Sequence, residues 1–401
     1  MQPNRAIWTY PWDVQDLGLD AVATELRERA GLNRISLASA YHAGRFLQPR
    51  SPRRTTFSPE DGTIYFRPDP ARWAQSRLQP QVASLVAESD VLRDLVAARD
   101  RTGLSVAAWT VCLHNSRLGA AYPDAATESV FGERYAHALC PSHPDARNYV
   151  CTLVEDLTHG CRVDAVELET IGFMGYRHGL HHEKDGVGLT AEDDLLLSLC
   201  FCPFCRDGAA KAGVDVESAA ATARNWLSES FGRAVPTPRL PRLLTEGLAA
   251  FAPWPALHAY LLWRSVPVMS LIADIRARAH PDSAIHVIDL AAGWLGGVDQ
   301  AGLRDVCDGL ILCAYDIGPD EITRQTSEAR RALGPDRYLG TGLRVFYPEV
   351  AGPDMLAERV DAAIRGGASG VNFYNYGLIP AARLDWIRAA GAGLSHHGFS
   401  C

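Results

Sequence analysis

Short apolar runs rich in β-branched and aromatic residues recur along the chain, and a helical pattern follows each of them. Eight such runs are present: Ala6–Tyr10, Arg34–Ala38, Leu104–Leu113, Val163–Leu168, Ala284–Ile288, Gly309–Ala314, Tyr338–Leu343 and Gly370–Phe373. Most are nearly continuous rather than strictly alternating, which is typical of parallel strands buried on both faces. Eight alternating strand–helix units predict an α/β fold of the (β/α)8 TIM-barrel type.

The spacing between these runs indicates where the barrel is extended. The last four begin about 25 to 32 residues apart, the length of a bare strand–helix unit. The intervals after the second, third and fourth runs are roughly two to four times longer. We therefore expect long insertions after strands 2, 3 and 4, on the face where such barrels place active sites.

Composition and charge narrow the classes of function. Of 401 residues, 47% are hydrophobic and 21% charged, which excludes low-complexity disorder. The net charge of −8 argues against a nucleic-acid partner, whose binding site is normally basic. No run approaches the roughly 18 to 20 apolar residues of a membrane helix, so we expect no membrane partner. The sequence leaves the oligomeric state open, a homo-oligomer included.

The N-terminal segment and the cysteines bear on the compartment. Residues 1–12 contain no apolar stretch and no small-residue cleavage site, so we expect no signal peptide and a cytoplasmic protein. The ten cysteines are then thiols or metal ligands rather than disulfides.

Three cysteines lie in one short segment with the spacing C-x-C-x-x-C: Cys200, Cys202 and Cys205. Three thiolates this close favour a metal, and a structural zinc site requires a fourth ligand. Cys140, on the long loop after the third strand, is the best candidate, the alternative being that all four are ordinary buried thiols. We therefore predict one barrel domain over residues 1–401, with a zinc-clipped insertion at about 114–215 and a helical insertion at about 216–260.

The segments Cys140–Arg147 and Cys200–Cys205 resemble the zinc cluster of family 42 β-galactosidases. Those enzymes are retaining glycoside hydrolases built on a (β/α)8 barrel. The resemblance covers roughly residues 104–211 and implies a structural zinc near the active-site face. The chain departs from that clan in two places. Its fourth strand ends in Glu167-Leu-Glu169 without the clan's Asn-Glu pair, and its seventh strand, within residues 338–347, contains no glutamate.

Glu167 and Glu169 are two residues apart on one predicted strand, so their side chains share a face. Val166 and Leu168 then face the outer helices, and the two carboxylates face the barrel axis. Burial of a carboxylate there is energetically unfavourable unless the group is paired with a cation or hydrogen-bond donors, or takes part in catalysis. Glu169, nearer the mouth, is the first candidate for a general acid or base, and Glu167 is a deeper candidate. For either residue the alternative is a structural ion pair.

Other strand ends carry further polar candidates. Asp316, after the sixth strand, is a candidate for the second carboxylate of glycoside hydrolysis, with a turn role as its alternative. Asp289, after the fifth strand, is another candidate for this second carboxylate. Arg344, after the seventh strand, is placed to bind a substrate carboxylate or to orient a catalytic acid.

Aromatic and polar side chains gather at several predicted strand ends, as expected of a carbohydrate site with flat rings and hydrogen-bonding groups. The predicted substrate-binding residues are Tyr10, Tyr41, His42, Trp109, His114, Asn115, Asp289, Arg344, Asn372 and Tyr374. Each alone is equally consistent with packing. Their recurrence favours a pocket for a small polar ligand.

These patterns leave three functions in competition. The leading one is a glycoside hydrolase acting on a small or oligomeric carbohydrate by carboxylate acid/base catalysis, with Glu169, Asp316 and Glu167 as catalytic candidates. The second is a metal-dependent hydrolase or lyase that uses the loop His178–His182. The third is a barrel that binds a glycan without catalysis, which the missing glutamate of the seventh strand keeps open.

Overall fold

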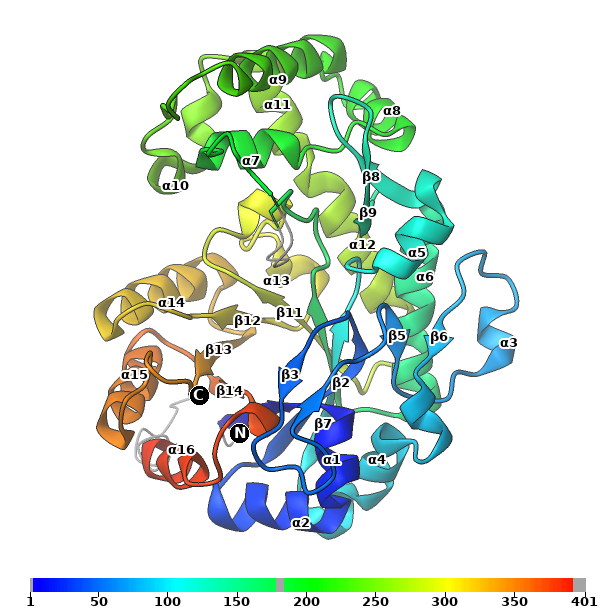
Figure 1. The fold of residues 1–401 in the computed structure, drawn as a ribbon, viewed down its shortest axis with the longest axis vertical. Helices are drawn as coiled ribbons and strands as arrows, with labels where there is room; N and C mark the ends of the chain where they lie inside the picture. The colour runs from blue at the N-terminus through cyan, green and yellow to red at the C-terminus, as the bar shows by residue number, and fades with distance from the viewer. Residues whose placement is uncertain (1–2, 178–183, 392–401) are drawn as a thin grey trace.

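The computed structural model describes residues 3–177 and 184–391, and its centre is a closed barrel of eight parallel strands (Figure 1). Each strand pairs with its sequence neighbour in the barrel, and the last pairs back with the first. The strands are β1 (Asn4–Thr9), β2 (Arg34–Tyr41), β7 (Ser105–Val111), β10 (Ala165–Glu169), β11 (Ala284–Asp289), β12 (Gly309–Cys313), β13 (Tyr338–Arg344) and β14 (Gly370–Tyr374). All eight runs predicted from the sequence form these strands, and the predicted (β/α)8 fold is confirmed.

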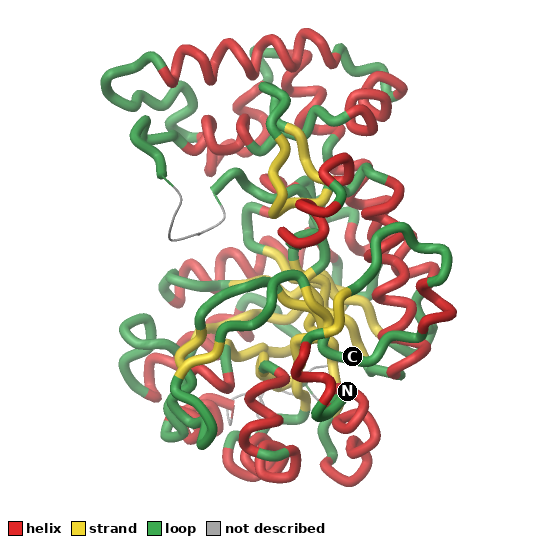
Figure 2. The backbone as a smooth tube through the Cα atoms, turned by 45° about the vertical axis from the view of Figure 1, so that its right-hand side comes forward, coloured by secondary structure: helices red, strands yellow, loops and turns green. Residues whose placement is uncertain are grey.

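Helices surround the barrel, and Figure 2 shows the strands enclosed by them. They are α1 (Pro11–Leu17), α2 (Leu19–Thr24), the π-helical η1 (Glu25–Arg29), α4 (Val91–Thr102), α6 (Pro144–Glu155), the π-helical η4 (Asp156–Cys161), α12 (Ser265–Arg278), α13 (Leu303–Val306), α14 (Pro319–Leu333), α15 (Pro353–Arg365), the 3-10 turn η7 (Tyr376–Leu378) and α16 (Arg383–Gly391).

The sequence of α14 illustrates why these segments are helical. Pro319 stands at the first helical position, where its missing N–H costs nothing, and Gly334 follows the last turn. Ile322, Ala329 and Leu333 are buried at helical spacing and pack into the core between sheet and helices.

The loops after the second, third and fourth barrel strands hold additional elements. After β2 come β3 (Phe46–Leu47), β4 (Thr56–Phe57), β5 (Thr63–Ile64), α3 (Pro70–Trp73), β6 (Gln81–Val82) and η2 (Ser84–Ala87). After β7 come α5 (Ser116–Ala121), η3 (Pro123–Ala125), β8 (Ala126–Glu128) and β9 (Arg134–Leu139). After β10 come α7 (Ala191–Leu197), α8 (Pro203–Lys211), α9 (Val216–Phe231), α10 (Leu243–Glu246), η5 (Gly247–Phe251) and α11 (Pro255–Trp263). Helices α7 to α11 form a separate layer at the top of Figure 1, and the β8–β9 hairpin reaches toward it. The predicted boundaries at 114–215 and 216–260 stay predictions.

From the sequence we expected no segment long and apolar enough to cross a membrane, but the structure contains one helical segment that meets this criterion. Pro255–Arg278, which comprises α11 and α12, is long and apolar enough to cross a membrane by length and composition, with a mean hydropathy of 1.2. Half of its apolar window is buried inside the protein, where α11 packs against α9 and α12 against α6. A single such helix is weak evidence for a membrane, because buried core helices pass the same test.

Candidate active site

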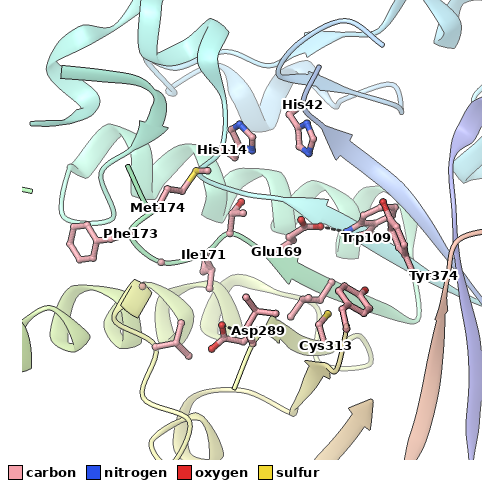
Figure 3. Close-up of a pocket in the computed structure, with 18 of the residues that line it drawn as sticks. His42, Trp109, His114, Glu169, Ile171, Phe173, Met174, Asp289, Cys313 and Tyr374 are labelled. Carbon is pink, nitrogen blue, oxygen red and sulfur yellow. Dashed lines mark hydrogen bonds between the residues drawn. The ribbon is translucent and has the colours of Figure 1, made fainter. Parts of the chain in front are cut away.

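A cavity of about 680 Å³ opens at the carboxyl ends of the barrel strands (Figure 3). Every barrel strand contributes a side chain to its wall: Trp8 from β1, Tyr41 from β2, Trp109 from β7, Glu169 from β10, Asp289 from β11, Cys313 from β12, Arg344 from β13 and Tyr374 from β14. This is the face on which barrels of this type hold their active sites.

Glu169 is the last residue of β10 and reaches the cavity because of the strand's alternation. Val166 and Leu168 pack between the sheet and the helices, so the residues at odd positions point inward. The indole Nε1–H of Trp109 donates a hydrogen bond to Glu169 Oε2, and Figure 3 shows the two side chains facing each other. Burial raises the pKa of Glu169, while the neighbouring His42 and the indole hydrogen bond oppose the rise.

Asp289 ends the neighbouring strand β11 and lines the same cavity. Its Oδ1 accepts a hydrogen bond of 2.8 Å from the backbone N–H of Leu290. Its Oδ2 is buried and has no hydrogen-bond partner among the described residues. Burial raises the pKa of Asp289 to about 7. A side chain at Gly293 would collide with Oδ2, so only glycine leaves room for this carboxyl group.

Aromatic rings form the wall beside Glu169. Trp109 contacts Trp8, Tyr41 and Tyr374, with ring centroids 6.1, 5.0 and 6.1 Å apart. Such rings offer flat apolar faces to a ligand. Tyr10 lies outside the lining and holds this wall together, since its hydroxyl is 3.1 Å from that of Tyr41 and 3.0 Å from that of Tyr374.

Two histidines extend the aromatic wall toward the rim. The His42 ring stacks on Tyr41 on one side, with a centroid distance of 4.3 Å, and on His114 on the other, at 4.6 Å. His42 Nδ1 lies 2.7 Å from the carbonyl oxygen of Ala43. The arrangement places flat rings with polar nitrogens at the cavity edge, which suits a hydroxylated ligand.

Seven of the ten predicted substrate-binding residues line the cavity: Tyr41, His42, Trp109, His114, Asp289, Arg344 and Tyr374. The other three do not. Tyr10 supports the wall from behind. Asn115 caps α5, where its Oδ1 accepts a 2.9 Å hydrogen bond from the Leu118 backbone N–H. Asn372 donates to the buried Glu167 at 3.3 Å.

Glu167 points to the barrel axis as predicted but lies beneath the cavity rather than in its lining. Its carboxylate accepts hydrogen bonds from Trp8 Nε1 at 2.9 Å and from Ser36 Oγ at 2.8 Å, besides the one from Asn372. The side chain is fully buried, and burial raises its pKa. These partners come from β1, β2 and β14, so Glu167 joins three strands inside the barrel.

Asp316 is held away from the cavity. Its side chain is 70% exposed, and its Oδ2 accepts a hydrogen bond of 2.6 Å from Arg344. It is absent from the described residues that line the cavity. The Arg344 guanidinium, which does line the cavity, also stacks over the Tyr315 ring at 4.6 Å. Among the described residues, the carboxyl group that lines the cavity together with Glu169 is therefore that of Asp289 rather than that of Asp316.

Sequence reasoning missed part of the lining. The missed residues are Trp8, 170–175, Arg177, Ile288, Leu290, Gly296, Val298, Cys313 and Tyr315. Trp8 and Cys313 stand at inward positions of predicted strands, so the alternation along β1 and β12 was a usable signal. The segment 170–175 directly follows β10, where a barrel is expected to place site residues.

The four predicted metal ligands come together. The sulfurs of Cys140, Cys200, Cys202 and Cys205 all lie within 4.8 Å of one another and are buried. The sulfur of Cys140 is 3.7 Å from that of Cys200, 3.7 Å from that of Cys202 and 3.5 Å from that of Cys205. A tetrahedral ion with metal–sulfur bonds of about 2.3 Å separates its ligand sulfurs by about 3.8 Å. The cluster therefore fits one tetrahedral metal ion.

The surroundings of the cluster also suit anionic sulfur. The backbone N–H groups of Glu128 and Ser142 each donate to a cluster sulfur at 3.4 Å, to Cys200 and to Cys140 respectively. Cys140 follows β9, and the other three cysteines lie at the start of α8 or just before it. A metal here would join the insertion after β7 to the insertion after β10, as the spacing predicted. The loop His178–His182 lies outside the described residues.

Comparisons with known proteins show which solved structures share this fold. No family model and no curated protein matches the chain, so the resemblance to family 42 β-galactosidases rests on the cysteine motifs alone. Among solved structures, the PgaB (BpsB) glycoside hydrolase domain from Bordetella bronchiseptica is similar, with a TM-score of 0.52, 16% identity and full coverage of both chains. The α-L-fucosidase isoenzyme 2 from Paenibacillus thiaminolyticus has a TM-score of 0.53 and 13% identity over 98% of this chain and 49% of its own. The chain thus shares its barrel fold with glycoside hydrolases.

Proposed function

We propose that the chain is a glycoside hydrolase that acts on a small or oligomeric carbohydrate with Glu169 and Asp289 as its two carboxyl groups. The observation that carries the proposal is that these residues end the adjacent strands β10 and β11 and line one aromatic cavity. Glycoside hydrolysis requires two carboxyl groups that flank the scissile bond. The fold shared with glycoside hydrolases supports the same reaction class.

The surroundings of the two carboxyl groups assign their roles. Asp289 has one unpartnered, buried oxygen and a pKa raised to about 7, so it keeps a proton near neutral pH and serves as the general acid. Burial raises the pKa of Glu169, but the indole hydrogen bond of Trp109 and the neighbouring His42 oppose that rise and favour its ionised form. Glu169 is then the nucleophile or the base. From its position on the strand Glu169 was a candidate for either the general acid or the general base, and its surroundings favour the second role.

The reaction follows from these roles. Asp289 donates its proton to the glycosidic oxygen as the bond from that oxygen to the anomeric carbon breaks. Glu169 either bonds to the anomeric carbon or takes the proton of the attacking water, and the anomeric configuration of the first product distinguishes the two. Trp8, Trp109 and Tyr374 face the apolar side of the sugar ring, and Arg344 and the rim histidines bind its hydroxyl groups.

We also propose that the cysteine cluster holds a structural Zn²⁺. Four thiolates close the tetrahedral coordination of zinc and leave no position for water or substrate, so the ion contributes folding energy rather than chemistry. The ligands would be Cys140, Cys200, Cys202 and Cys205. The ion would fix two irregular insertions to each other.

A panel of aryl glycosides tests the proposed reaction. The wild-type chain should release the aryl alcohol from at least one sugar, and Glu169→Gln should abolish release while ligand binding by calorimetry is retained. Glu358→Gln, an exposed position on α15, is the matched control and should keep wild-type activity. Sugar binding without turnover in either protein would contradict the proposal and favour a glycan-binding barrel.

A further inference from the structure

Arg264, between α11 and α12, is an unusual buried cation. The residue is 1% exposed, and none of its three guanidinium nitrogens has a hydrogen-bond partner among the described residues. A guanidinium carries five N–H donors, and burying it without partners is strongly unfavourable because the ion loses its hydration. The fold therefore requires a compensating negative charge near Arg264.

Arg264 is linked to the cysteine cluster through Tyr260, because the Arg264 backbone N–H donates to the Tyr260 carbonyl oxygen at 3.2 Å and the Tyr260 hydroxyl reaches the Cys200 backbone. Burial lowers the pKa of Arg264 to about 10, and the neighbouring Tyr260, Cys205 and Cys200 oppose that fall. Tyr260 donates its hydroxyl hydrogen to the carbonyl oxygen of Cys200, so in this arrangement it is a neutral phenol and not the counter-charge of Arg264. The two cysteines belong to the cluster described above. They carry charge only as thiolates.

The metal-bound cluster would supply the negative charge that Arg264 needs as a partner. Four thiolates and one divalent ion have a net charge of −2, whereas four neutral thiols have none. A buried dianion needs a nearby cation as much as a buried cation needs an anion. The unpartnered guanidinium is thus explained by a metal-loaded cluster and unexplained by a thiol cluster.

We propose that Arg264 is the counter-charge of the metal-bound cysteine cluster and connects that cluster to the wall of the cavity. The inference rests on the proposed metal centre and goes beyond it, because it assigns a residue that is not a ligand. Arg264 is a positioning residue, since it acts through the cluster and the wall.

The connection to the cavity runs through Phe173. The Arg264 guanidinium lies over the Phe173 ring at 4.8 Å, and Phe173 lines the cavity. The Phe173 backbone N–H donates to the Gly296 carbonyl oxygen at 2.8 Å, which ties the loop after β10 to the loop after β11. A side chain at Gly297 would come within 2.9 Å of the Arg264 carbonyl oxygen, so the backbone of Arg264 also packs closely on that second loop.

The test compares Arg264→Met and Arg264→Lys with the wild type, using zinc competition with a chromophoric chelator. Met keeps the length of the side chain without its charge, and zinc affinity should fall at least tenfold, as for other residues outside the ligand set. Lys keeps the charge and should restore most of the affinity. Cobalt substitution adds a second readout, since the thiolate-to-cobalt absorption of Arg264→Met should weaken at a metal concentration that saturates the wild type.

Thermal unfolding with and without metal separates charge compensation from simple packing. Arg264→Met should destabilise the metal-loaded chain and stabilise the metal-free chain, because the guanidinium is unpaired once the thiols are neutral. If Arg264→Met yields no folded protein, Arg264→Gln takes its place in the same comparison. Arg276→Met, also on α12 but paired with Asp308 at 2.7 Å, is the control and should not alter zinc affinity.

Two results would overturn the inference. One is unchanged zinc affinity in Arg264→Met, and the other is the same sign of stability change with and without metal. A wild-type chain purified without zinc that also fails to bind added zinc would refute the metal centre itself, together with the role of Arg264. Glycosidase activity is measured separately, so the failure of either proposal is distinguishable from failure of the proposed reaction.

Discussion

The indole Nε1–H of Trp109 on β7 donates a hydrogen bond to Oε2 of Glu169 on the adjacent strand β10. The donor stabilises the ionised carboxyl group and offsets part of the cost of its burial. Trp109 also stands at the centre of the aromatic wall, in contact with Trp8, Tyr41 and Tyr374. The Trp109 side chain therefore both shapes the cavity and opposes the rise in the pKa of Glu169 that burial causes.

Trp109→Phe should separate these two roles, because phenylalanine keeps an aromatic ring and removes the N–H. A hydrogen bond to a charged group is worth about 1.5 to 3 kcal/mol, so kcat should fall about 10- to 100-fold. The pKa of Glu169 should rise further, which moves the acidic limb of the kcat/KM profile to higher pH. A pH–rate profile of both proteins measures this, and an unshifted acidic limb would exclude Glu169 as the ionised group.

Asp289 should produce the alkaline limb of the same profile. Because burial raises its pKa to about 7, the protonated acid is lost as the pH rises through that value, and kcat/KM should decline there. Asp289→Asn should abolish turnover of substrates with poor leaving groups. Turnover of a dinitrophenyl glycoside should persist, since that leaving group needs no proton. Equal loss on both substrates would contradict the role of Asp289 as the acid.

Asp289 should also make folding stability depend on pH. Its folded pKa lies above its value of 3.8 in the unfolded chain, so its contribution to stability is full below pH 3.8 and is lost as the pH rises through about 7. The shift corresponds to at most about 4 kcal/mol. Asp289→Asn should therefore gain stability relative to the wild type between pH 4.5 and pH 8, measured by urea unfolding. A constant difference across this range would refute the shifted pKa.

Glu167 should prove structural rather than catalytic. Glu167→Gln keeps the shape of the side chain, and kcat/KM should remain within a few fold of the wild type because the residue lies below the cavity. The pKa of Glu167 is raised by burial, so the neutral variant should be the more stable protein at high pH. A large loss of kcat with an unchanged unfolding midpoint would place Glu167 in the chemistry.

Removal of the proposed metal should destabilise the two insertions that carry the cysteine cluster. Cys202→Ser should lower zinc content from one ion per chain and reduce the unfolding temperature by several degrees, because ligand loss removes part of a binding energy of about 10 kcal/mol or more. Cys307→Ser is the matched control, since Cys307 is buried elsewhere with its thiol 3.4 Å from the Leu303 carbonyl oxygen. Metal analysis and calorimetry check both variants, and equal behaviour of the two would rule out the cluster as the metal site.

Much of the fold could be predicted from local sequence patterns. The eight apolar runs predicted the eight barrel strands because a parallel strand that is buried on both faces needs apolar residues at nearly every position. The alternation around Glu167 and Glu169 likewise predicted which side chains point inward, since the strand repeat is two residues. The spacing of the three nearby cysteines pointed to a cluster, and the gaps between runs predicted long insertions.

The strand ends were predicted less completely, because position along a strand does not reveal which partner a side chain will meet. Asp316 and Asp289 were both candidates after their strands, and only the folded chain pairs Asp316 with Arg344 and leaves Asp289 in the cavity. Glu167 and Glu169 share one face, yet the hydrogen bonds of Trp8, Ser36 and Asn372 withdraw Glu167 into the barrel.

By itself, the sequence determined the barrel, the inward direction of the β10 carboxylates and the three adjacent thiols, because each of these follows from periodicity or short spacing. Only the tertiary structure decided that Asp289 shares a cavity with Glu169, and that Arg264 is buried next to Tyr260, whose hydroxyl is hydrogen-bonded to the cluster residue Cys200. Asp289 lies 120 residues from Glu169, and Arg264 lies 59 residues from Cys205, the nearest cysteine of the cluster. Long-range contacts of this kind depend on how the strands and insertions pack.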